Sequence, residues 1–189
     1  MAVAGGARAG ASFEEQYAAA ADSVLRQSGR EAFDAMRTLR EVEAKGPRTA
    51  GDAAYPRSPF GDALRQVAQL IKADVGLEIA YAEIGGWDTH VNQGGAEGQL
   101  AARLGDVGRT LGALVTDLGT QMQDVVVVTM SEFGRTVAEN GTRGTDHGHG
   151  NAMLVLGGPV RGGRVYGRWP GLDVAQRVDG RDLAITTDF

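Results

Sequence analysis

Residues 124–136 read Asp-Val-Val-Val-Val-Thr-Met-Ser-Glu-Phe-Gly-Arg-Thr, and this stretch decides the fold that we predict. The four consecutive valines have no polar interruption, which is typical of a central strand covered on both faces. Charged and hydroxyl side chains follow directly after the strand. The stretch therefore predicts a buried strand that ends beside a polar loop.

A strand and a helix are predicted immediately before this stretch. Residues 77–84 form a mostly apolar run bounded by glycines, which fits a second buried strand. Leucine and valine side chains recur at helical spacing from Leu100 to Leu118, which predicts an amphipathic helix. Strand, helix and strand in that order predict parallel pairing with a right-handed crossover. Residues 152–156 and 163–167 are two further short runs, and the first can return antiparallel because no helix precedes it.

Three helices are predicted ahead of the first strand. One begins at Ser12, which starts a capping-box pattern, and a break at Ser28–Gly29 separates it from a second helix. The second helix ends near Lys45. Ser58-Pro59 is a typical start for the third, because a capping hydroxyl precedes a proline at the first helical position.

The order of these elements predicts an α/β fold, a three-layer sandwich with a mostly parallel sheet flanked by helices. Residues 1–57 are predicted to form a helical segment that packs on the domain, and residues 58–189 to form the α/β core. Residues 182–184 suggest that another element is starting just before the sequence ends. We therefore expect the core to be incomplete at its C-terminus.

Composition and charge exclude several classes of protein. A net charge of −5 with scattered lysine and arginine provides no basic face for nucleic acid. No apolar run approaches the length of a membrane span. The absence of cysteine excludes disulfides, thiolate nucleophiles and cysteine-ligated metal sites. The 29 glycines, many of them in 85–98 and 134–171, indicate loops shaped for close backbone approach.

The predicted topology brings three polar loops to the carboxyl edge of the sheet, where ligands bind in open α/β folds. All three histidines of the protein fall in these loops, together with several carboxylates. Nitrogen and oxygen donors of this kind predict a divalent metal, Zn²⁺ or Mn²⁺ first and Fe²⁺ as a further candidate. The candidate ligands are Asp88, His90, Glu132, Asp146, His147 and His149.

Arg135 is the candidate catalytic residue, because its planar guanidinium can hold a tetrahedral oxyanion. A bound cation can lower the pKa of a water molecule to about 7 or polarise a phosphoryl or sulfuryl oxygen. Simpler roles fit the same residues: Asp88 and His90 as a cap and a surface imidazole, Glu132 as a cap, and Arg135 as an ion-pair partner. The convergence of three loops favours the functional interpretation more than any one motif does.

Three ordered motifs resemble the DUF1501 family of bacterial proteins: residues 85–90 (Gly-Gly-Trp-Asp-Thr-His), residues 125–136, and residues 144–150 (Gly-Thr-Asp-His-Gly-His-Gly). The resemblance covers at least residues 58–189 and implies a place in the alkaline phosphatase/sulfatase superfamily. It implies an alkaline phosphatase-like fold and a metal-dependent hydrolase of a phosphate or sulfate ester. A small-molecule ester or a polysaccharide-type substrate and a periplasmic or secreted location are implied in the same way.

The resemblance also implies which side chains hold metal. Glu132 stands where the superfamily usually shows an Asp-His pair, so its match is looser. The side chains similar to the ligands of one metal are Asp88, His90 and either His147 or His149.

Residues 1–60 lack the opening strand and export signal that the resemblance implies, so we expect the chain to be a C-terminal fragment. The alternative to an enzyme is a non-catalytic exported binding or assembly module that retains the fold and a structural metal. The sequence does not single out a nucleophile among the hydroxyls near the predicted edge, which are Thr89, Ser131 and Thr145.

Overall fold

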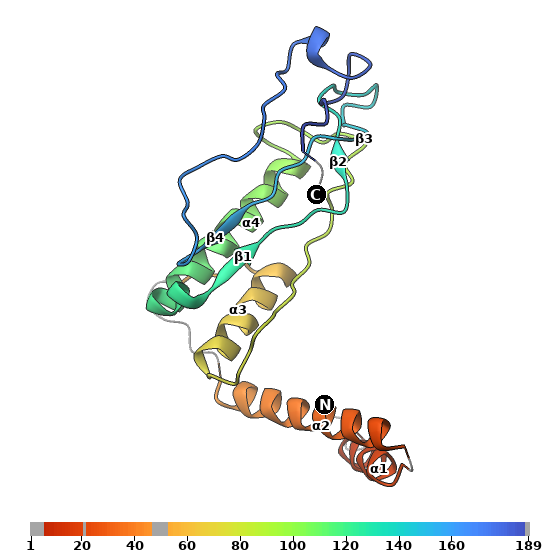
Figure 1. The fold of residues 1–189 in the computed structure, drawn as a ribbon, viewed down its shortest axis with the longest axis vertical. Helices are drawn as coiled ribbons and strands as arrows, with labels where there is room; N and C mark the ends of the chain where they lie inside the picture. The colour runs from red at the N-terminus through yellow and green to blue at the C-terminus, as the bar shows by residue number, and fades with distance from the viewer. Residues whose placement is uncertain (1–5, 21, 47–52, 188–189) are drawn as a thin grey trace. The chain divides into compact units, whose positions relative to one another are not determined.

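The computed structural model describes residues 6–20, 22–46 and 53–187. The helices are α1 (Gly6–Ala18), α2 (Ser23–Ala44), α3 (Pro59–Lys72) and α4 (Gln99–Leu118), with 3₁₀ turns η1 (Gly119–Asp124) and η2 (Val174–Gln176) (Figure 1). The strands are β1 (Val126–Val128), β2 (Gly134–Arg135), β3 (His147–Gly148) and β4 (Val155–Gly157). The chain forms two compact units, residues 1–48 with 69–79 and residues 49–68 with 80–189.

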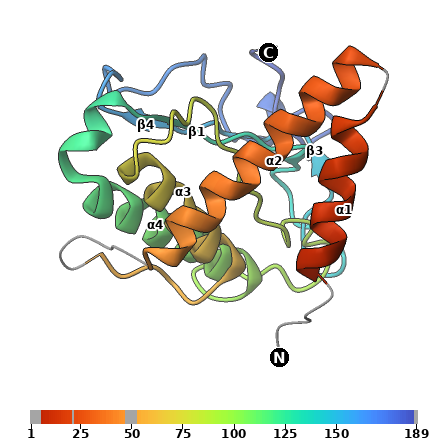
Figure 2. The same cartoon turned by 90° about the horizontal axis from the view of Figure 1, so that it is seen from below.

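In the first unit, α1 folds back along α2 (Figure 2). The ring of Tyr17 on α1 meets Phe33 on α2 edge to face, with centroids 6.1 Å apart. A side chain at Gly29 would collide with the Tyr17 ring, so glycine inside α2 permits this close approach. The helix break predicted at this glycine is therefore wrong: α2 begins earlier, after Asp22, whose carboxylate accepts a hydrogen bond from a backbone N–H of the first turn.

In the second unit, the buried apolar side chains lie mainly on α4, and the helix predicted from Leu100 to Leu118 is confirmed. Burial of each such leucine stabilises the fold by about 1.5–3 kcal/mol. Ser58 donates a hydrogen bond to Asp106 on α4 and accepts one from the first turn of α3, as its predicted capping role requires. The buried apolar side chains of this unit are Leu64, Ala68, Leu111, Ala113, Leu114, Leu118 and Met122.

Strands β1 and β4 pair antiparallel, and α4 lies on one face of the pair (Figures 1 and 2). Val127 pairs with Leu156, so the predicted antiparallel return of residues 152–156 is confirmed. The prediction of a strand covered on both faces is wrong, because Val126 and Val128 are each about half exposed. The valine run forms a strand with one covered face and one open face.

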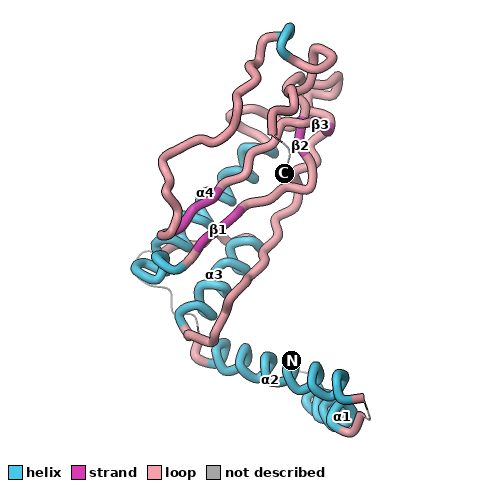
Figure 3. Tube along the Cα trace, in the orientation of Figure 1, coloured by secondary structure: helices cyan, strands magenta, loops and turns pink. Residues whose placement is uncertain are grey.

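The predicted three-layer sandwich with a mostly parallel sheet is wrong, and with it the alkaline phosphatase-like architecture. The strands of the described residues form two small antiparallel sheets, β1–β4 and β2–β3. Residues 77–84, the predicted partner of β1, have no strand partner and leave Ile79 and Tyr81 exposed (Figure 3). An apolar run becomes a strand only when a neighbour completes its backbone hydrogen bonds, and among the described residues β1 pairs only with β4. Residues 163–167 are also a loop.

None of the helices in the described ranges is long and apolar enough to cross a membrane.

Candidate metal centre

The short β2–β3 pair brings two of the predicted polar loops together. Arg135 on β2 pairs with His147 on β3, and no side chain fits at Gly134 because the backbone of the opposite strand fills that space. The third loop, residues 85–98, joins them through the backbone of Thr89, whose carbonyl accepts a hydrogen bond from the N–H of Thr145. Side chains from three separate stretches of sequence thus meet at one place.

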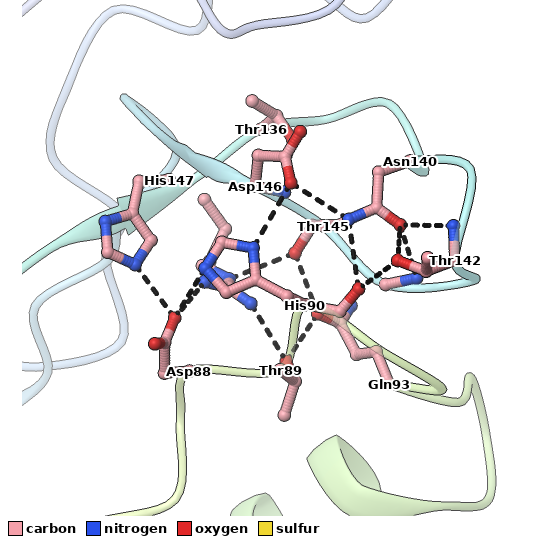
Figure 4. A network of polar contacts seen from close by, with 12 residues as sticks. Asp88, Thr89, His90, Gln93, Thr136, Asn140, Thr142, Thr145, Asp146 and His147 are labelled. Carbon is pink, nitrogen blue, oxygen red and sulfur yellow. Dashed lines mark hydrogen bonds and ion pairs between the residues drawn. The ribbon is translucent and has the colours of Figure 1, made fainter.

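Asp88, His90 and His147 form the group that we call the metal cluster (Figure 4). One possible ligand atom from each residue lies within 4.8 Å of the other two. The Oδ1 atom of Asp88 is 2.9 Å from Nε2 of His90 and 2.8 Å from Nε2 of His147. Zinc bonds of about 2.0–2.2 Å need ligands about 3–4 Å apart, so this donor set fits a divalent ion after small side-chain adjustments.

The two imidazoles of the metal cluster are held by ring stacking. Their centroids are 5.0 Å apart, and the ring of Phe133 also stacks on His147, with centroids 4.4 Å apart. The side chains of Asp88, His90 and His147 are 58%, 42% and 55% exposed. The metal cluster is therefore open to solvent while its rings are kept in place.

Arg135 fixes the carboxylate of the metal cluster. Its Nη1 donates to Asp88 Oδ1 at 2.9 Å, Nε donates to Thr145 Oγ1 at 3.0 Å, and Nη2 donates to Thr89 Oγ1 at 3.3 Å. The hydrogen bond from His147, followed by that from Arg135, holds the pKa of Asp88 below its usual range. Arg135 thus lies where the sequence predicts it, but these contacts engage its Nε and both terminal nitrogens.

Two of the candidate nucleophiles are buried behind the metal cluster. The hydroxyls of Thr89 and Thr145 both donate to Oε1 of Gln93, at 2.7 and 2.8 Å. The third, Ser131, is exposed and donates to the carbonyl of Phe133. The two threonines therefore support Arg135 instead of facing solvent.

Asp146 lies beside the metal cluster without joining it. Its Oδ1 is 3.2 Å from Nδ1 of His90 and accepts a hydrogen bond of 2.9 Å from Asn140, while its Oδ2 accepts one of 2.6 Å from Arg181. These contacts, that of Asn140 foremost, lower the pKa of Asp146 to about 2. At neutral pH the side chain of Asp146 is therefore an ionised carboxylate, which can only accept hydrogen bonds.

Asn140 is a residue of this site that the sequence did not indicate. Its amide donates to the carbonyl of His90 at 3.0 Å, and its Oδ1 accepts hydrogen bonds from the backbone N–H groups of Thr142 and Gly144. A side chain at Gly144 would overlap the carbonyl of His90. The pair Asn140-Gly141 is a turn signal that marks this loop, although it does not reveal the contact with His90.

The family described as "Protein of unknown function (DUF1501)" matches residues 2–188. The chain belongs to the DUF1501 family. The family resemblance seen in the sequence is thereby confirmed. No curated protein and no solved structure matches this DUF1501 chain significantly.

Besides Asp146, two further predicted ligands of this DUF1501 protein lie outside the metal cluster. The backbone N–H of His149 donates a hydrogen bond to Oδ1 of Asp182 at 2.9 Å, and Nδ1 of His149 lies 3.1 Å from the carbonyl oxygen of Leu183. Glu132 is exposed and makes no hydrogen bond or ion pair within the described part of the chain. The structure thus gathers Asp88, His90 and His147, with Arg135 and Asp146 in contact with them.

Proposed function

We propose that this DUF1501 protein is a metal-dependent hydrolase that holds one divalent ion at the metal cluster and acts on a phosphate or sulfate ester. The observation that carries the proposal is the convergence of Asp88, His90 and His147 within 4.8 Å. Two imidazoles and one carboxylate suit Zn²⁺, Mn²⁺ or Fe²⁺. The ester class rests on the motif resemblance described above.

The chain's own residues have distinct roles in this proposal. A divalent ion bound there would polarise an ester oxygen or lower the pKa of a water molecule to about 7. Arg135 keeps Asp88 ionised and aimed at the two imidazoles, and Phe133 keeps His147 in its orientation. The exposure of all three ligand side chains leaves room for an ester to approach from solvent.

A second candidate is a non-catalytic module with a structural metal. The observation that favours it is the origin of the ligands: Asp88 and His90 belong to one loop, whereas His147 belongs to β3. A metal bound by all three would cross-link the two segments. Such an ion stabilises the fold, because its binding is coupled to folding.

Elemental analysis of the purified chain tests metal binding. Wild type should hold about one equivalent of Zn, Mn or Fe, and His147→Ala should lose it. His149→Ala is the matched control, since His149 lies outside the metal cluster and its loss should leave the metal content unchanged. A folded wild type that stays metal-free after reloading would overturn the proposal.

A substrate screen with phosphate and sulfate esters separates the two candidates. If the protein is a hydrolase, loaded wild type turns over an ester, and His147→Ala abolishes turnover with little change in the free energy of unfolding. If the metal is structural, metal removal or His147→Ala lowers the free energy of unfolding and no ester is turned over.

A further inference from the structure

Both ring nitrogens of His90 face carboxylates. Its Nε2 lies 2.9 Å from Oδ1 of Asp88, and its Nδ1 lies 3.2 Å from Oδ1 of Asp146. An ionised carboxylate can only accept hydrogen bonds, so a ring nitrogen that faces one must carry a proton or bind a metal. When a metal occupies Nε2, the single remaining proton of the ring must be on Nδ1, facing Asp146.

The carboxylate of Asp146 is fixed from several directions. Asn140 donates to its Oδ1, and Arg181 donates to its Oδ2 (Figure 4 shows the Asn140 contact). Asp146 could turn toward the metal cluster only by giving up these charge-assisted hydrogen bonds. Its present position leaves it facing the nitrogen of His90 that points away from Asp88.

We propose that Asp146 is a positioning residue: it accepts a hydrogen bond from Nδ1–H of His90 and so presents Nε2 of His90 to the metal, without being a ligand itself. The proposal rests on the metal binding proposed above. A carboxylate on the far nitrogen of a ligating histidine fixes the ring orientation and raises the basicity of the ligating nitrogen. Loss of such a partner lowers metal affinity by about 10–100-fold.

The backbone of His90 is held by contacts of its own, which do not use the carboxylate of Asp146. Its carbonyl accepts hydrogen bonds from the amide of Asn140 at 3.0 Å and from the hydroxyl of Thr142 at 2.6 Å. Removal of the Asp146 carboxylate therefore takes away the partner of Nδ1, while the hydroxyl of Thr142 still ties the main chain of His90 to the loop. A change in metal binding can then be assigned to the ring.

The experiment is a metal titration of the full chain with Zn²⁺ for affinity and Co²⁺ for its visible spectrum. Asp146→Ala should weaken binding by about 10–100-fold and leave the Co²⁺ spectrum unchanged. Asp146→Asn, which keeps an acceptor oxygen for His90, should weaken it less. Arg181→Gln, which frees one oxygen of Asp146, gives a second and milder test of the same contact.

Two controls define the scale of the effect. Glu139→Gln removes one negative charge from an exposed position in the same loop and should not change the affinity. His90→Ala removes a ligand and should change both the affinity and the Co²⁺ spectrum. If Asp146→Ala changes the spectrum as His90→Ala does, Asp146 is a ligand and the proposal is wrong. An unchanged affinity in Asp146→Ala also overturns it.

A second measurement keeps this inference separable from the proposed function. This measurement uses the metal-free chain. Proton–nitrogen NMR should show a slowly exchanging Nδ1–H on His90 that is lost in Asp146→Ala but kept in Glu139→Gln. If wild type binds no metal and this signal is present, metal binding fails but the contact by which Asp146 orients His90 stands. If the signal is absent, the positioning role fails.

Discussion

Two regions of the second unit are stabilised by different interactions, one by apolar burial and the other by hydrogen bonds. Around α4, apolar side chains such as Leu114 and Leu118 are buried with few polar contacts. Around the metal cluster, hydrogen bonds of Arg135, Asn140 and Asp146 connect three loops. Burial is non-directional, whereas the loops depend on particular donors and acceptors. Substitutions should therefore act through lost burial in the first region and through lost hydrogen bonds in the second.

The largest effect on the free energy of unfolding is expected at Leu114, which is 2% exposed on α4. Leu114→Ala should lower it by about 2–5 kcal/mol through lost burial and a cavity. Leu104→Ala, on the exposed side of the same helix, should change it by no more than about 0.5 kcal/mol. Urea unfolding measures both, and equal losses would show that α4 does not organise the core.

The next effect is expected at Asn140, where the loop depends on one side chain. Asn140→Ala leaves the carbonyl of His90 and the N–H of Gly144 without this partner, and should cost about 1–3 kcal/mol. Zn²⁺ affinity should fall as well. Asn151→Ala is the control, because the one hydrogen bond of its side chain within the described residues is accepted from the N–H of the adjacent Ala152, and it should change neither quantity. Unchanged Zn²⁺ affinity in Asn140→Ala would show that metal binding does not depend on the hydrogen bonds of Asn140.

A polar contact inside the apolar region gives a smaller and pH-dependent effect. The hydroxyl of Tyr55 donates to the buried carboxylate of Asp117 at 3.2 Å, and burial followed by the charge of Asp117 raises the pKa of Tyr55. Tyr55→Phe should cost about 1 kcal/mol at neutral pH. Because the folded-state pKa is raised, the contribution is fully present below about pH 10, the ordinary value, and is lost as the pH rises above it.

Urea unfolding of wild type and Tyr55→Phe at neutral and strongly alkaline pH measures this difference. The two proteins should converge at alkaline pH. If the free energies of unfolding of the two proteins differ more at alkaline pH than at neutral pH, the folded state favours the tyrosinate.

The smallest effect is expected at Glu132, which the sequence predicts as a ligand and the structure leaves exposed. Glu132→Gln should change the free energy of unfolding by less than about 0.5 kcal/mol. Zn²⁺ affinity should also stay within about twofold, a small fraction of the loss expected for a metal partner. A loss as large as that of His90→Ala in the same titration would place Glu132 among the ligands.

The helices could be predicted from sequence, because their apolar spacing is local. The break in the first pair was misplaced at Gly29, because the ring of Tyr17 lies against that glycine and no local pattern reveals such a contact. The valine run was correctly predicted as a strand, but its burial was not. Whether residues 77–84 pair with it depends on contacts between segments distant in the sequence, and the structure pairs it with β4.

The metal cluster could be predicted in part. Three motifs rich in histidine, aspartate and glycine identified the loops, and Asp88, His90 and His147 do converge. The motifs could not show that Asp146 faces the far nitrogen of His90, because that depends on side-chain direction. Asn140 and Gln93 escaped notice because amides are common in loops, and only their partners distinguish them.

Two glycines, Gly134 on β2 and Gly144 in the loop before β3, should behave like functional residues in a mutational scan. At Gly134 and Gly144 the facing backbone occupies the position that any side chain would need. In a saturation library these two positions should tolerate substitution as poorly as His90 or His147. A map of intolerance would therefore mark these glycines and the proposed metal ligands alike, and only a chemical readout such as bound metal would tell them apart.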